Sequence, residues 1–216
     1  MSSEATPVTA QHFAYIAERT AGDDDFLVAL KQAAAEAGIP SIWINPAQAS
    51  LMGILLKLVG AKQVVEVGTL AGYSAITMAR ALPADGRVAT VELEPKHADF
   101  AEDWISRSDV ADRITVIRGA ADDVLPHIED GSVDAVFLDA DKAGYIGYSA
   151  QALRMLRPGG LFMADNAFAF GELFDERPRD GEVGAVRAFN EHMAGLAGFE
   201  GVIVPVGDGL WVAVRE

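Results

Sequence analysis

The chain has 216 residues, half of them hydrophobic, which suits one large α/β domain or one domain with an appended helical arm. A formal net charge of −15 argues against nucleic acid as a partner, and the lack of cysteine excludes disulfides, thiolate metal sites and thiol catalysis. The sequence contains neither an apolar run of about 18 residues nor a signal peptide in the polar stretch 1–7, which predicts a cytoplasmic protein without a membrane partner.

Residues 1–60 are predicted to form a helical arm. Helical segments are expected at 9–19, 23–37 and 46–58, each opened by a capping or acidic residue, and the last two stop at a glycine. Such an arm suits a lid or a dimer contact over a site, and it equally suits ordinary packing on a sheet. The pattern favours neither.

A strand, a tight turn and a helix are predicted around Glu66. A β-branched run ends there, Gly68 and Gly72 follow four residues apart, and an apolar helix begins at Tyr73. This order is typical of the first half of a βαβ nucleotide-binding unit, although the third glycine of a dinucleotide fingerprint is missing. Glu66 would repel a phosphate but suits the amino group of an amino-acid-bearing ligand. A plain turn with glycines needed for packing is the alternative.

Strands and helices then alternate along the chain. Strands are expected at 63–67, 87–92, 114–118, 133–138 and 160–165, and helices at 72–82, 95–107, 121–129 and 143–156. Such alternation predicts a parallel sheet with right-handed crossovers and helices on both faces.

The segment after Asp165 departs from this alternation. A loop of about fifteen residues runs to Arg179, longer than packing requires, and is a candidate substrate loop. A helix at 181–195 and strands at 201–206 and 210–215 follow, and the strands predict an antiparallel hairpin. We therefore predict a single α/β domain over 1–216, with a helical arm at 1–60 and a doubly wound, mostly parallel, seven-stranded core at 61–216.

Acidic residues stand where the predicted parallel strands end. They are Glu66, Glu92, Asp139 and Asp165. In a doubly wound sheet these positions line one crevice, where ligands bind. Burying acids together is unfavourable by several kcal/mol unless cations or hydrogen bonds compensate, so the pattern indicates a site rather than a core.

Glu92 and the segment after the third strand suit a nucleoside. Glu92 lies about twenty residues after the glycine turn, the spacing at which an acid accepts hydrogen bonds from ribose hydroxyls. The small residues at 119–121 would let an adenine ring lie against the backbone, and Asp122 either accepts from its amine or caps the next helix. This chemistry does not distinguish NAD from S-adenosylmethionine (SAM), since both carry a ribose.

Asp139, Asp165 and Asn166 supply three oxygens from neighbouring strand ends. Three oxygen ligands leave positions open on an octahedral cation such as Mg²⁺, and open positions suit the two oxygens of a vicinal diol. Lys142 stands three residues beyond Asp139, where it could act on a bound hydroxyl. Taken singly, Asp-Asn is a common turn and Lys142 a solvated helix start, but their combination predicts a site.

Five stretches together resemble the cation-dependent O-methyltransferases of the class I SAM-dependent methyltransferases, the group that contains the catechol and caffeoyl-CoA enzymes. The stretches are EVGTLAGYS, VELEP, FLDADKAGYIGY, LRPGGLFMADN and VGDGL, and they cover nearly all of the chain from Asn45. The resemblance implies a Rossmann-like methyltransferase fold that binds SAM and a divalent cation, Mg²⁺ or another such as Ca²⁺ or Mn²⁺.

The resemblance also implies residue roles. For SAM, it places Glu92 on the ribose, Ala121 and Asp122 beside the adenine, Asp139 nearby, and on the methionine part Glu66, Gly68, Thr69, Gly72 and Ser74. For the metal, it implies the ligands Asp139, Asp165 and Asn166. For catalysis, it implies Asp139 and Lys142, with Lys142 as the general base. Ala169 stands where the family often has a tryptophan. We therefore expect a roomy acceptor pocket with Phe168 and Phe170 as stacking partners.

The predicted function is metal-dependent methylation of a hydroxyl on a catechol-like, small aromatic molecule by a homodimeric enzyme. An NAD-linked oxidoreductase is one alternative, but the missing third glycine and the oxygen cluster argue against it. A SAM-binding interaction protein without catalytic activity is another. The presence of Lys142 and of all three oxygen ligands argues against that alternative.

Overall fold

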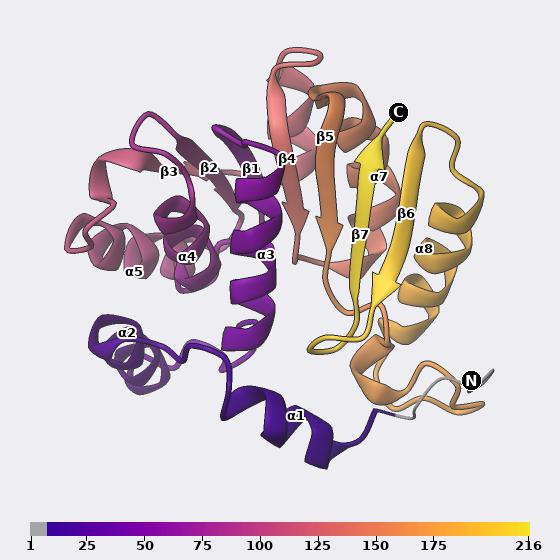
Figure 1. Ribbon diagram of the computed structural model, residues 1–216, viewed down its shortest axis with the longest axis horizontal. Coiled ribbons are helices and arrows are strands. Elements are labelled where there is room, and N and C mark those ends of the chain that lie inside the picture. Colours follow the sequence, from indigo (N-terminus) through magenta and orange to yellow (C-terminus); the bar gives the residue numbers. More distant parts are fainter. Residues whose placement is uncertain (1–7) are drawn as a thin grey trace.

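The computed structural model describes residues 8–216 and is built on a seven-stranded sheet (Figure 1). Stretch 1–7, in which no signal peptide is predicted, lies outside the described residues. The strands are β1 Gln63–Val67, β2 Arg87–Glu92, β3 Ile114–Arg118, β4 Val133–Leu138, β5 Leu156–Ala164, β6 Phe199–Val204 and β7 Leu210–Arg215. Their order is β3-β2-β1-β4-β5-β7-β6, with β1 to β5 parallel and β7 antiparallel to both neighbours. The predicted fold class is confirmed.

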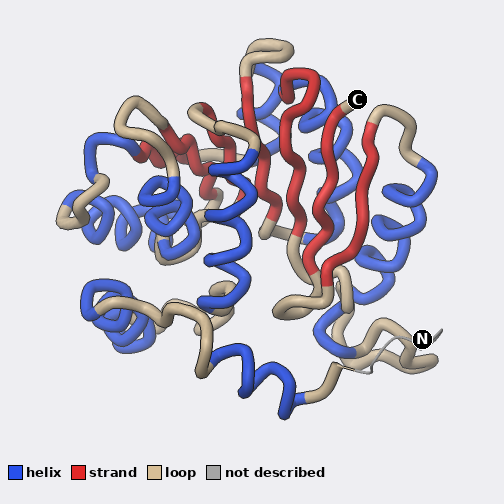
Figure 2. Tube along the Cα trace, in the orientation of Figure 1, coloured by secondary structure: helices blue, strands red, loops and turns tan. Residues whose placement is uncertain are grey.

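Helices cover both faces of the sheet (Figure 2). They are α1 Ala10–Ala17, α2 Asp25–Glu36, α3 Pro46–Leu58, α4 Tyr73–Ala81, α5 Pro95–Ser106, α6 Ala121–Val124, α7 Tyr145–Met155 and α8 Val183–Gly195. Successive strand residues point to opposite faces, so Val64 packs with α2 to α5 while Val65 packs with α6 to α8. This two-sided burial explains why the strands are continuous apolar runs rather than alternating ones.

The helices of the arm begin where the sequence predicts. Asp24 accepts a hydrogen bond from the Leu27 N–H at the start of α2, and Asn45 accepts one from the Gln48 N–H at the start of α3. No residue of α1 is buried, whereas α3 packs on α4 and buries Met52 and Leu56 in the core. The third helix of the arm is therefore part of the layer over the sheet.

Several boundaries differ from the prediction by two or more residues. The helix expected at 121–129 ends at Val124, because Pro126 follows in a short 3₁₀ turn, Leu125–His127. The strand expected from residue 160 begins at Leu156, which pairs with Val133 before residues 157–160 bulge out and pairing resumes at Leu161. The strand expected at 201 begins at Phe199.

Within residues 8–216, we find no helix that is both long enough and apolar enough to cross a membrane.

Candidate active site

A cavity of about 540 Å³ lies at the carboxyl ends of the parallel strands. The strand order reverses between β1 and β4, and such a switch point opens a crevice in a doubly wound sheet. Eight of the predicted site residues line the cavity: Gly68, Thr69, Ser74, Glu92, Ala121, Asp139, Lys142 and Asn166. Glu66, Gly72, Asp122 and Asp165 do not line it. The sequence therefore predicted part of the wall, together with four residues that do not line it.

The turn after β1 lies directly against the end of β4. A Cβ atom on Gly68 would lie 2.0 Å from the carbonyl oxygen of Asp139, so only glycine fits there. Gly68 and Gly72 also have positive φ angles of 101° and 84°, which L side chains rarely adopt. The glycines are thus required by the backbone path that brings the turn beside Asp139.

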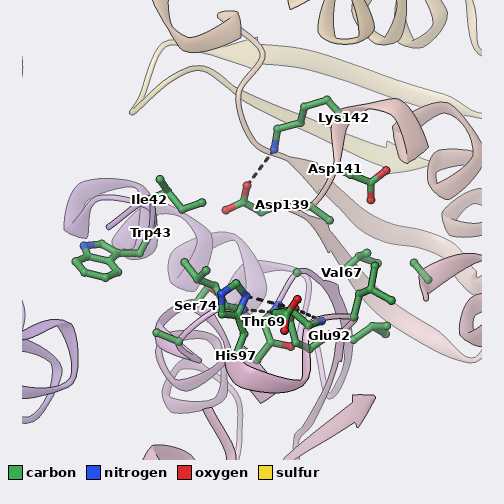
Figure 3. Close-up of a pocket in the computed structure, with 18 of the residues that line it drawn as sticks. Ile42, Trp43, Val67, Thr69, Ser74, Glu92, His97, Asp139, Asp141 and Lys142 are labelled. Carbon is green, nitrogen blue, oxygen red and sulfur yellow. Dashed lines mark hydrogen bonds and ion pairs between the residues drawn. The ribbon is translucent and has the colours of Figure 1, made fainter. Parts of the chain in front are cut away.

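Glu92 braces the same turn. Its Oε2 accepts hydrogen bonds from the N–H groups of Thr69 at 3.1 Å and Leu70 at 2.8 Å, and its Oε1 accepts one from Glu94 at 2.9 Å. Figure 3 shows this carboxylate at one end of the cavity, with Thr69 and His97 beside it. The bracing role was missed from the sequence, although an acid at the end of the strand beside a glycine turn is a usable signal.

Glu66 is fully buried behind the turn. Neither carboxylate oxygen has a hydrogen-bond partner of good geometry within residues 8–216. Burial raises the pKa of Glu66 to about 8, and the hydroxyls of Ser74 and Thr90 offset only part of that rise. Glu66 thus lies behind residues that line the cavity and does not line it itself.

Lys142 and Asp139 face each other at the opposite end of the cavity (Figure 3). The Lys142 Nζ lies 3.2 Å from Asp139 Oδ1 and donates to the Tyr145 hydroxyl at 2.7 Å. That hydroxyl donates in turn to the Leu138 carbonyl oxygen at 3.1 Å. Only 5% of Lys142 is exposed, so its ammonium group is held by these partners rather than by solvent.

Asp165 does not line the cavity and is held by the arm. The Gln48 Nε2 on α3 donates to Asp165 Oδ1 at 2.7 Å, and Gln48 is only 1% exposed. Burial and then the negative charge of Asp139 raise the pKa of Asp165 to about 7. Burial likewise raises the pKa of Asp139, against the lowering effect of Lys142. The site thus holds two carboxylates whose negative charges are poorly compensated.

Two of the three predicted oxygen ligands reach the cavity, and their chemistry suits a hard divalent cation. Asp139 and Asn166 line the cavity, and the raised pKa values of Asp139 and Asp165 indicate negative charge that a cation would neutralise. Among the side chains of residues 8–216, no group of three or more His, Asp or Glu could hold a metal. The predicted set relies on two carboxylates and one amide.

The acceptor wall differs from the prediction. Ala169 is fully buried and does not line the cavity, so its small size adds no space there. The Phe168 ring packs on Gly209, where a Cβ atom would lie 2.8 Å from the ring. Only Phe170 reaches the cavity, and it is 40% exposed. The expected stacking role of Phe168 is therefore wrong, because its ring is committed to the β6–β7 loop.

The arm supplies an apolar wall whose residues were not predicted. Ile42 and Trp43 line the cavity (Figure 3). Ile44 lines it as well, as does Tyr73 at the start of α4. The Tyr73 hydroxyl donates to Asp23 at the start of α2 at 2.7 Å, which ties the arm to the core. The signal available in the sequence was the apolar run 42–44 outside any helix. The arm thus contributes to the site in addition to packing on the sheet.

Comparison with known proteins identifies the family. The O-methyltransferase family matches residues 17–216, nearly the whole chain. The chain belongs to this family. It is 39% identical over 205 residues to a catechol O-methyltransferase of Niastella koreensis, and the aligned residues cover 94% of this chain and 90% of that protein.

Solved structures of O-methyltransferases agree with this assignment. An O-methyltransferase from Bacillus cereus, solved in complex with SAH, has a TM-score of 0.85 and 33% identity, over 94% of this chain and 96% of that one. The O-methyltransferase TomG from Streptomyces achromogenes, involved in tomaymycin synthesis and solved with SAM, has a TM-score of 0.84 and 31% identity, over 95% and 96%. The predicted family and enzyme class are confirmed, and an NAD-linked oxidoreductase is not supported.

Proposed function

We propose that this O-methyltransferase transfers the methyl group of SAM to a hydroxyl of a catechol-like aromatic molecule, with a divalent cation at the acceptor end of the cavity. The main observation behind the proposal is that one cavity has two ends of different chemistry. Glu92 and the glycine turn form one end, and Lys142 with Asp139 forms the other. The first end suits a nucleoside, and the second suits an acidic hydroxyl.

The donor end offers groups for each part of SAM. Glu92 can accept hydrogen bonds from ribose hydroxyls, and the small Ala121 borders the space for adenine. Gly68, Thr69 and Ser74 line the space for the methionine part. The buried carboxyl of Glu66 beneath them favours a ligand that carries an ammonium group, because a positive charge nearby lowers its raised pKa.

The acceptor end supplies groups that bind and deprotonate a diol. Asp139, Asp165 and Asn166 would hold the cation, which when bound supplies positive charge that lowers the pKa of an acceptor hydroxyl. Lys142 holds its Nζ at the cavity wall, where, as the free amine, it can take the hydroxyl proton and become the ammonium ion that pairs with Asp139. Phe170 and Trp43 border the space for a flat ring.

Methyl transfer itself depends mainly on the relative position of the acceptor oxygen and the methyl group. As the acceptor oxygen forms its bond to the methyl carbon, the bond from carbon to sulfur breaks and its electron pair stays on sulfur, which gives SAH. Holding the two reactants in line can lower the activation barrier by roughly 7–11 kcal/mol. The buried Lys142 and the rigid glycine turn are suited to that positioning.

The test is a substrate panel with labelled SAM, run with Mg²⁺ and with excess chelator. We expect turnover of catechols, caffeoyl derivatives and flavonoids with vicinal hydroxyls, little turnover of the matched monohydroxy compounds, and none with chelator. Full activity in chelator would remove the cation from the proposal. Equal rates on a catechol and its monohydroxy analogue would show that two oxygens are not needed. SAM binding without any turnover would instead favour an interaction protein without catalytic activity.

We also propose that 1–216 forms one methyltransferase domain that pairs with a second copy of itself. Val202 and Val214 are exposed on the face of β6 and β7 that lies on the same side of the sheet as α3, and Ile54 and Leu58 are exposed on α3 (Figure 1). Exposed apolar patches of this kind mark interaction surfaces. Light scattering should give a dimer for the wild type and a monomer for Leu58→Glu, with Lys57→Glu as the matched control. A wild-type monomer would contradict the pairing.

A further inference from the structure

The loop between β6 and β7 contacts the acceptor end of the site through Asp208. Asp208 Oδ2 accepts one hydrogen bond from the Asn166 Nδ2 at 3.1 Å and another from the Phe170 N–H at 2.8 Å. The Asp208 backbone oxygen also accepts from the Phe168 N–H at 2.8 Å, and the Gly209 oxygen accepts from Ala167 at 2.9 Å. One loop therefore holds the whole segment that follows β5.

The hydrogen bond to Asn166 decides which atom of its amide is available. Because Asp208 is a carboxylate acceptor, it selects the nitrogen of the amide and turns the oxygen away from itself. Asn166 lines the cavity, and a hard cation binds the oxygen and not the nitrogen of an amide. Groups behind a ligand that orient it in this way commonly change metal affinity by about 10–100-fold when they are removed.

The hydrogen bond to Phe170 holds an unfavourable backbone. Asn166, Ala169 and Phe170 have φ angles of 66°, 52° and 60°, a region that residues other than glycine rarely adopt. Such conformations persist only where surrounding contacts impose them. Asp208 supplies one such contact, and it thereby keeps the Phe170 ring at the cavity wall.

We propose that Asp208 is a positioning residue that orients Asn166 toward the cation and Phe170 toward the aromatic acceptor at the same time. This inference rests on the proposed cation site. It predicts that the two functions of the acceptor end weaken together when Asp208 is lost, while the donor end is unaffected. The β6–β7 loop is itself fixed from the other side, because Gly207 lies against the buried Gln48, where a Cβ atom would come within 2.1 Å of the Gln48 side-chain oxygen.

The test compares Asp208→Ala with Asp208→Asn in the intact enzyme. Mn²⁺ binding is measured by electron paramagnetic resonance without acceptor, so that the readout does not depend on turnover. We expect Asp208→Ala to weaken Mn²⁺ binding at least tenfold. Asp208→Asn should stay within about threefold of wild type, because one amide oxygen in place of Oδ2 can accept both hydrogen bonds. Catechol KM should rise in parallel with the metal Kd, and kcat at saturating metal should recover toward wild type.

Controls separate positioning from charge and from folding. Glu176→Gln removes a negative charge from the loop between β5 and α8 and should bind Mn²⁺ like wild type. SAM affinity should be near wild type in every variant, and every variant should show a cooperative thermal transition without metal. If Asp208→Ala does not fold, Asp208→Ser provides the second test, since its hydroxyl is too short to reach Asn166.

The possible outcomes are distinct. Unchanged Mn²⁺ affinity in Asp208→Ala would overturn the proposal. An equal loss in Asp208→Asn and Asp208→Ala would also overturn it, because the effect would then be one of charge rather than of orientation. Failure of the wild type to bind Mn²⁺ would instead remove the cation site on which the inference rests.

Discussion

The two ends of the cavity are held together by different kinds of contact. At the donor end, Glu92 is fixed by backbone N–H groups of Thr69, Leu70 and Glu94, all of which belong to neighbouring strand ends. At the acceptor end, side chains from α3, from the start of α7, from the end of β5 and from the β6–β7 loop hold one another. The donor end is a property of the βαβ turn, whereas the acceptor end is a property of the assembled fold. Substitutions at the acceptor end should therefore be less damaging to cofactor binding than substitutions at the donor end.

The largest effect is expected at Lys142. If Lys142 takes the hydroxyl proton, Lys142→Ala should lower kcat by about 10²–10⁴ while SAM affinity stays near wild type, because its role is confined to the transition state. Rising pH should partly restore the activity as the phenol ionises by itself. The measurement is kcat across pH, with the exposed Lys57→Ala as control. A loss of SAM affinity as large as the loss of kcat would show that the two ends are not separable.

The buried Glu66 at the donor end can be tested through the pH dependence of the free energy of unfolding. Its folded pKa of about 8 lies above the ordinary value of 4.5, so the folded protein keeps a proton that the unfolded chain releases. The stability that this proton provides is complete below about pH 4.5 and is lost as the pH rises through about 8. The loss amounts to a few kcal/mol.

Glu66→Gln should therefore flatten the dependence of unfolding free energy on pH between about 5 and 9. Denaturant titrations without ligand measure this, with the exposed Glu18→Gln as control. If the wild type and Glu66→Gln change in parallel with pH, the buried carboxyl does not carry the proton assigned to it.

Glu92 tests whether the donor end depends on one side chain. Removing charge-assisted hydrogen bonds worth about 1.5–3 kcal/mol each should weaken SAM binding at least tenfold in Glu92→Ala. Glu92→Gln should lose less, because its amide oxygen can still accept from the turn. Calorimetry with SAM measures both, and Glu129→Ala, at an exposed residue that does not line the cavity, is the control. Unchanged affinity in Glu92→Ala would remove the ribose assignment.

The same contrast explains what the sequence could and could not predict. Glu92, the glycine turn and the ends of the parallel strands follow from local pattern and from the known switch point of such sheets. Gln48 on Asp165 and Asp208 on Asn166 join residues that are 117 and 42 positions apart, so no local pattern announces them. Ala169 and Phe168 were misplaced for a related reason. Their positions depend on three positive φ angles and on the β6–β7 loop, which composition does not reveal.

The smallest effect is expected at Tyr145, beneath Lys142. Its hydroxyl accepts from Nζ and donates to the Leu138 carbonyl oxygen, so Tyr145→Phe removes a brace without removing the ammonium group. In the free-amine form of Lys142 that takes the hydroxyl proton, this hydrogen bond is neutral and contributes about 0.5–1.5 kcal/mol, which predicts a two- to tenfold fall in kcat. SAM affinity should not change, because the donor end shares no hydrogen bond with Tyr145. The pH dependence of kcat should shift, since Lys142 then relies on Asp139 alone. A wild-type kcat and pH profile in Tyr145→Phe would show that Asp139 suffices to hold Lys142, and the acceptor end would then depend on fewer contacts than the structure displays.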